Sequence, residues 1–64
     1  MNQLLSYLKD KHDARIAELG LFLAQGGIKD IAEYQRVCGV IQGLNTANEF
    51  ILDFDKRLES DENE

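Results

Sequence analysis

The chain turns at residues 26–33, which read Gly26-Gly27-Ile28-Lys29-Asp30-Ile31-Ala32-Glu33. A glycine just past the last turn of a helix can take the left-handed conformation that closes the helix end. Asp30 followed three residues later by Glu33 is typical of a capping box, which satisfies backbone amides at the start of the next helix. The sequence therefore predicts two helices joined by a short turn at residues 26–29, and a connection of that length favours an antiparallel hairpin.

The first helix is predicted to run from about residue 2 to about residue 25, with Asn2 as its cap. Its apolar residues form a stripe about 120° wide, as expected of a helix with one buried face. The stripe consists of Leu4, Leu5, Leu8, Ile16, Leu19, Phe22 and Leu23. Apolar spacings of three and four, rather than two, exclude a strand.

The second helix is predicted to run from about residue 30 to about residue 59, and its apolar residues form two adjacent sets. The first set is Val37, Ile41, Leu44, Ile51 and Leu58, and the second is Ala32, Gly39, Gly43, Ala47, Phe50 and Phe54. Together they cover about half of the helix surface or more, which one partner helix cannot bury. We expect the first set to face the other helix and the second to contact another molecule.

Gly39, Gly43 and Ala47 are four residues apart and form a small-residue ridge that another helix can approach closely. A glycine inside a helix costs about 1 kcal/mol relative to alanine, so a close contact should offset that cost. Two interpretations remain open at this point: a close crossing within the hairpin, or an interface with another protein. The predicted protein interface consists of Gly39, Gly43, Ala47, Phe50 and Phe54.

With 64 residues, the chain forms one small domain. A core of this size supplies only about 3–5 kcal/mol unless disulfides, metal or other chains add to it. Cys38 is the only cysteine and His12 the only histidine, so an intrachain disulfide is excluded and no metal or other cofactor is expected. We therefore expect the all-α hairpin to be completed by oligomerisation or by docking on a larger partner.

The net charge of −5 is concentrated at the C-terminus, because residues 1–58 carry a net charge of only −1. Residues 60–64 are predicted to form an acidic tail beyond the second helix. No basic surface of the kind that binds nucleic acid is present, so direct nucleic-acid binding is not expected. A signal peptide and a membrane-spanning stretch are also not expected, which predicts a soluble protein.

His12 and Cys38 are the two single residues whose side chains are weighed for a chemical role. His12 lies within the apolar stripe of the first helix, where a histidine is either a ligand or proton-transfer group or a partly buried side chain with a polar partner. Cys38 is either a small apolar packing residue or a nucleophile, and the second role would need a base beside it. Hairpin geometry places His12 opposite residues 43–44, more than one helical turn from Cys38. No catalytic, cofactor-binding or metal-binding residue is predicted, and the protein is not expected to be an enzyme.

The pattern Tyr34-x-x-x-Cys38-Gly39-x-Ile41-x-Gly43-Leu44-x-x-Ala47-x-x-x-Ile51, with the turn at residues 26–30, resembles small two-helix hairpin proteins of tailed bacteriophages that are often encoded near virion structural genes. The resemblance covers most of residues 4–58 and includes no catalytic residue. It implies a virion component or assembly factor that packs against copies of itself or a larger phage structural protein. It also implies a location in the virion or the host cytoplasm.

The alternative function is that of a small acidic phage effector that binds and inhibits a host protein. The overall excess of acidic residues supports this alternative, but the placement of those residues along the chain does not. An effector that imitates DNA should spread carboxylates along one face, whereas this chain concentrates them in its last six residues. The charge pattern therefore favours the assembly function.

Overall fold

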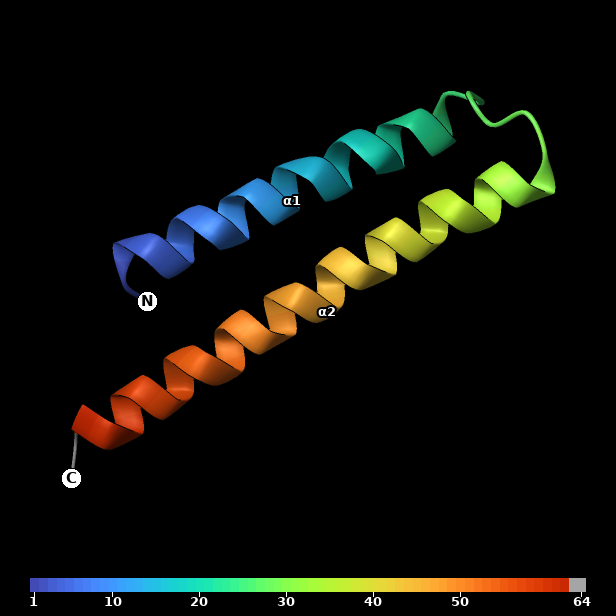
Figure 1. Ribbon diagram of the computed structural model, residues 1–64. Coiled ribbons are helices and arrows are strands. Elements are labelled where there is room, and N and C mark those ends of the chain that lie inside the picture. The colour runs from blue at the N-terminus through green and yellow to red at the C-terminus, as the bar shows by residue number, and fades with distance from the viewer. Residues whose placement is uncertain (63–64) are drawn as a thin grey trace.

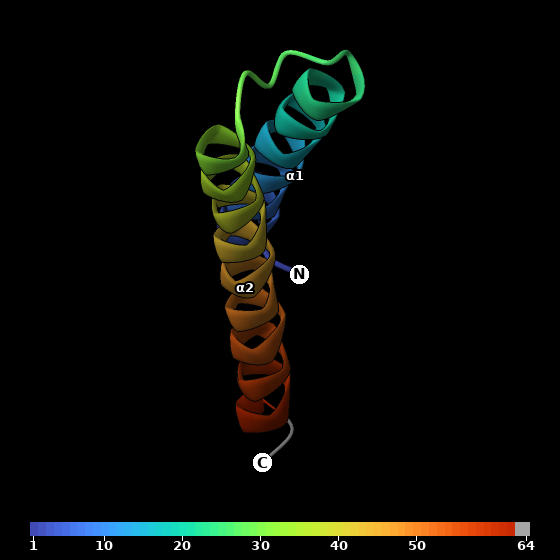
Figure 2. The same cartoon turned by 90° about the vertical axis from the view of Figure 1, so that its right-hand side faces the viewer.

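The protein is an all-α, two-helix hairpin, as the sequence predicts. The computed structural model describes the backbone of residues 1–62 and the side chains of residues 1–60. Helices α1 (Gln3–Ala24) and α2 (Ile31–Glu62) make up this part of the chain, which contains no strand. They lie antiparallel and pack against each other (Figure 1). The hairpin is a rod with extents of 52 × 17 × 13 Å, and α2 runs beyond the start of α1 (Figure 2).

Both ends of α1 are closed by residues that the sequence identifies. Asn2 Oδ1 accepts the backbone N–H of Leu5 at 2.8 Å, which confirms Asn2 as the cap. At the other end Gly26 has a φ of 74°, the left-handed conformation that glycine adopts without strain. The N–H groups of Gly26 and Gly27 donate to the carbonyls of Leu23 and Phe22 at 3.2 and 3.1 Å. These two bonds form a Schellman motif, which stops α1 and turns the chain.

Asp30 caps α2 from the other side of the turn. Its Oδ1 accepts the backbone N–H of Glu33 at 2.8 Å, as predicted. In a standard capping box the Glu33 carboxylate would accept the backbone N–H of Asp30. Here it accepts the N–H of Lys29, one residue earlier in the chain, at 3.4 Å. The turn therefore holds both helix ends through local hydrogen bonds, and these bonds fix the hairpin topology.

Helix α2 ends later than the sequence analysis predicts. It runs to Glu62, whereas the predicted end is residue 59 with an acidic tail over residues 60–64. The sequence after Glu59 contains no glycine or proline to stop a helix, so the backbone continues through the first part of that tail. Residues 63 and 64 of the predicted tail lie outside the described residues.

The core between the helices is narrow. Its buried apolar side chains are Leu5, Val37 and Ile51, and Val37 is the most enclosed at 1% exposure. Ile41, Leu44 and Leu58 are half-buried beside them, so the first apolar set of α2 faces α1 as predicted. The stripe on α1 is less covered than its width indicates, because Leu4, Leu8 and Phe22 are all exposed at its edge. A single partner helix therefore buries only the side chains along the line where the two helices are closest.

Candidate protein interface

The two glycines of the small-residue ridge do not take part in the packing of the hairpin. Gly39 and Gly43 are exposed, and a Cβ added to either would meet nothing within 4 Å. Helix α1 instead packs on the side of α2 that carries Val37 and Ile51. At about 100° per residue, that side lies about 120° around the helix from the glycines. Of the two interpretations of these glycines, a close crossing within the hairpin is therefore excluded.

Phe50 and Phe54 continue the same side of α2 towards its C-terminus. Spacings of four, four, three and four residues from Gly39 through Gly43, Ala47 and Phe50 to Phe54 keep these positions on one side of the helix. Phe50 is 69% exposed and Phe54 is 51% exposed. Ala47 is half-buried between the glycines and the phenylalanines. The five residues predicted from the sequence thus share one side of α2, which α1 leaves open.

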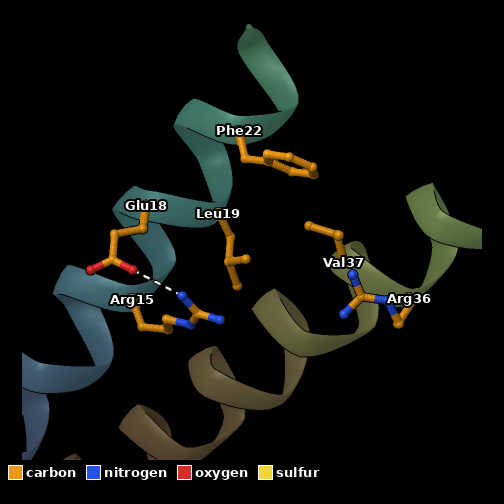
Figure 3. A pocket seen from close by; sticks show the side chains of 6 residues that line it. All are labelled: Arg15, Glu18, Leu19, Phe22, Arg36 and Val37. Carbon is orange, nitrogen blue, oxygen red and sulfur yellow. Dashed lines mark hydrogen bonds and ion pairs between the residues drawn. The ribbon is translucent and has the colours of Figure 1, made fainter. Parts of the chain in front are cut away.

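Helix α1 contributes to the same side of the hairpin. An open depression of about 370 Å³ near the turn is lined by Arg15, Glu18, Leu19, Phe22, Arg36 and Val37 (Figure 3). Because Phe22 of α1 and Arg36 of α2 line one depression, the edges of the helices that carry them face the same way. Arg36 lies on the glycine side of α2, one turn before Gly39 and Val40. Leu4 lies five full turns from Phe22 and therefore on the same edge of α1.

These residues define one broad surface, which we call the open face. Its exposed apolar side chains are Leu4, Leu8 and Phe22 from α1 and Val40, Phe50 and Phe54 from α2, and Gly39, Gly43 and Ala47 lie among them. The predicted interface contains the α2 residues of this surface except Val40 and none of its α1 residues, because the apolar stripe predicts Leu4, Leu8 and Phe22 to be buried. The sequence carries no signal for this exposure, because a stripe about 120° wide is also typical of a helix whose apolar face is fully covered.

Charged groups border the open face near the turn. Arg15 Nη1 donates to Glu18 Oε2 at 2.9 Å along the surface of α1, so its partner is an intrachain carboxylate (Figure 3). Phe22 lies against the turn itself, and a side chain at Gly27 would overlap its ring. The apolar floor of Leu19, Phe22 and Val37 is therefore held in place by both the helix packing and the turn.

A polar network crosses the hairpin on the other side of the core. His12 Nδ1 lies 2.9 Å from Asn48 Oδ1, and Asn48 Nδ2 donates to Asp13 Oδ1 at 2.9 Å. Lys9 Nζ donates to the other oxygen of Asp13 at 2.8 Å. The hydrogen bond and charge of Lys9, and then the Asn48 amide and the charge of His12, lower the pKa of Asp13. His12 is thus a half-buried side chain with a polar partner, and Asn48 was not predicted from the sequence.

Cys38 and His12 have different polar neighbours. His12 bonds to Asn48, while the titratable neighbour of Cys38 is Tyr34, one turn away on α2. The Cys38 thiol raises the pKa of the Tyr34 hydroxyl. Among the described residues, no group of three or more His, Cys, Asp or Glu side chains is placed to hold a metal ion. Neither helix, over its described length, is both long and apolar enough to cross a membrane.

The features that stand out are therefore the open face and the polar network. Comparison with protein-family models, curated proteins and solved structures finds no match to this chain.

Proposed function

We propose that this protein is a non-enzymatic helical assembly protein, which acts by packing its open face against another protein surface. The observation that carries the proposal is the exposure of Phe50 and Phe54 beside the bare backbone of Gly39 and Gly43. Contiguous exposed apolar surface with aromatic side chains is characteristic of protein interaction sites. The narrow core adds support, because a chain with so few buried apolar side chains gains stability when a partner covers its open side.

The resemblance to phage hairpin proteins supports a more specific proposal. On that basis the protein is a virion component or an assembly factor of a phage particle. Quantitative mass spectrometry of purified particles tests this role. A fixed number of copies per particle is expected of a virion component, and an assembly factor is expected in precursor particles. Absence from both would contradict the phage role.

A pair of matched variants tests the open face separately. Phe50→Ser removes an aromatic side chain from the open face, and Leu52→Ser removes an exposed apolar side chain from the opposite side of α2. We expect Phe50→Ser to lose incorporation into particles or precursors and Leu52→Ser to retain it. Equal incorporation of both variants would show that the open face is not the assembly surface. Circular dichroism checks that both variants remain helical.

A further inference from the structure

We propose that the open face binds the same face of a second copy of this chain, with the two α2 helices antiparallel and related by a two-fold axis. In this dimer Phe50 and Phe54 of each copy lie over Gly43 and Gly39 of the other. The inference rests on the proposed function, since it names the partner of the open face. Its basis is the order in which large and small residues follow one another along α2.

The four residues are symmetric about one point of the helix. Gly43 and Phe50 lie at equal distances on either side of the midpoint between Thr46 and Ala47, and Gly39 and Phe54 lie at equal distances further out. When two identical helices cross antiparallel at that midpoint, position 43 faces position 50 and position 39 faces position 54. One two-fold axis therefore places Phe50 of each copy over Gly43 of the other copy, and Phe54 over Gly39. An isologous interface needs this kind of self-complementarity.

The surface around these residues fits this pairing. A Cβ added to Gly39 or Gly43 would meet nothing within 4 Å, so the backbone at these positions is free to receive an aromatic ring. Phe50 and Phe54 are 69% and 51% exposed, so their rings have surface left to bury. Ala47, next to the proposed axis, is small enough for the two helices to approach each other closely. Each exposed ring thus has an unoccupied surface opposite it.

The hairpin exposes more surface than a compact chain of its size. Its accessible surface is 4999 Å², whereas a compact monomer of this mass exposes about 4200 Å². The radius of gyration is 15.3 Å, against about 11 Å for a compact chain of this length. The excess area of about 800 Å² comes from the elongated shape of the hairpin, which leaves one whole side of both helices for a partner to cover.

The charge distribution of α2 selects the antiparallel arrangement over the parallel one. Between Ala47 and Glu62, two cations stand against six carboxylates, a net charge of −4. Between Ile31 and Thr46, Glu33 and Arg36 cancel. A parallel pair would place the two acidic halves side by side, where their negative charges would repel each other. An antiparallel pair keeps these halves apart and places each beside the half of its partner that carries Arg36.

Sedimentation velocity of the purified chain, from about 5 to about 200 µM, tests the dimer directly. We expect a concentration-dependent monomer–dimer equilibrium. A monomer throughout this range would overturn the proposed dimer and leave the proposed function to the particle experiments above. If the chain dimerises while Phe50→Ser still enters particles, the proposed assembly role of the open face fails instead. The two failures are therefore distinguishable.

An exchange of residues tests the register. Gly43→Phe alone and Phe50→Gly alone should each raise the dissociation constant at least about tenfold, the change expected when an interface contact is lost. The double variant G43F/F50G restores one ring and one glycine at each facing pair and should recover the affinity to within about threefold. Because the double variant keeps the wild-type composition, intrinsic helix propensity does not account for a recovery. Failure of the double variant to recover would overturn the register.

A cysteine cross-link tests the position of the axis. In a Cys38→Ser background, Ala47→Cys should form a disulfide-linked dimer under mild oxidation, because each copy of this residue lies beside its own counterpart. Leu21→Cys in the same background is the matched control, since Leu21 is exposed on the far side of α1. Equal or faster cross-linking of the control would contradict an axis near Ala47.

Discussion

His12 and Asn48 are 36 positions apart in the sequence, and their side chains join the two helices through a 2.9 Å contact between His12 Nδ1 and Asn48 Oδ1. Because an amide oxygen only accepts, His12 donates from Nδ1. Asn48 is 8% exposed, and both ends of its amide are used, since Nδ2 donates to Asp13. A slip of one helix by a single turn, about 5.4 Å, would break both bonds, so the network fixes the register of the hairpin.

Asn48→Ala should lower the free energy of unfolding by about 1–2 kcal/mol. The change removes two hydrogen bonds to partly exposed partners that water can then solvate, and such bonds contribute about 0.5–1.5 kcal/mol each. Urea unfolding followed by circular dichroism measures the loss. Asn45→Ala is the matched control, because Asn45 is exposed on the same helix and should change stability by less than about 0.5 kcal/mol. Equal effects of the two substitutions would show that the network does not stabilise the hairpin.

Asp13 should make the hairpin sensitive to acid. The hydrogen bond from Lys9 is the main cause that holds its pKa below 3.8 in the folded chain. The unfolded chain therefore takes up this proton first as the pH falls, so the contribution to stability is present above pH 3.8 and is lost as the pH falls through the folded-state pKa.

The comparison with Asp13→Asn isolates this effect, because the variant keeps an oxygen for the Asn48 amide but cannot titrate. Urea midpoints of both proteins, measured from about pH 6 down to about pH 2, should converge at the acid end. A difference between the midpoints that stays constant over the whole range would rule out Asp13 as the titrating group. High salt should reduce the difference near neutral pH, because Asp13 and Lys9 are partly exposed.

The helix ends at the start of α1 and at the turn were predictable from the sequence because their signals are local. Asn2, Gly26 and Asp30 each bond to backbone groups within five residues, and residue identity alone indicates such bonds. The register was less predictable. Hairpin geometry alone predicts His12 opposite residues 43–44, whereas its partner is Asn48. The cause is that side chains lean towards the N-terminus of their own helix, so in an antiparallel pair His12 and Asn48 lean towards each other.

The open face was only half predictable for a different reason. Hydrophobic periodicity identifies which residues share a side of a helix, but it does not tell how far a partner helix covers that side. Leu4 and Phe22 share a stripe with the buried Leu5, yet both are exposed because α2 contacts only one edge of that stripe. Asn48 did leave a sequence signal, since it is a polar residue four positions after Leu44 and three before Ile51, within the apolar set that faces α1.

Gly20→Ala and Gly26→Ala should change stability in opposite directions. Gly20 lies inside α1 with nothing within 4 Å of an added Cβ, so alanine should stabilise the chain by about 0.5–1 kcal/mol through its higher helix propensity. Gly26 has equal space but a φ of 74°, and alanine there should destabilise by about 1–2 kcal/mol. Thermal or urea unfolding of the pair measures both effects. A stabilising Gly26→Ala would contradict the left-handed turn.

Gly39→Ala and Gly43→Ala should strengthen folding and weaken association. Each added methyl group meets nothing within the hairpin, so it should raise the stability of the monomer by about 0.5–1 kcal/mol. The same methyl group would lift the partner's phenyl ring from the backbone and raise the dissociation constant. Folding is measured by urea unfolding in a Phe50→Ser background, at a concentration where sedimentation shows a monomer. Association is measured by sedimentation of the chains with Phe50 intact.

Gly20→Ala is the control for this separation of folding from association. It should stabilise the monomer by a similar amount, because it removes the same helix-interior glycine cost on α1, away from the open face. Its dissociation constant should stay within about twofold of that of the unmodified chain. If Gly43→Ala associates as tightly as Gly20→Ala, then no aromatic ring lies on Gly43 in the dimer. If Gly43→Ala and Gly20→Ala weaken association equally, the loss of affinity does not depend on where the glycine lies and does not come from contacts at the open face.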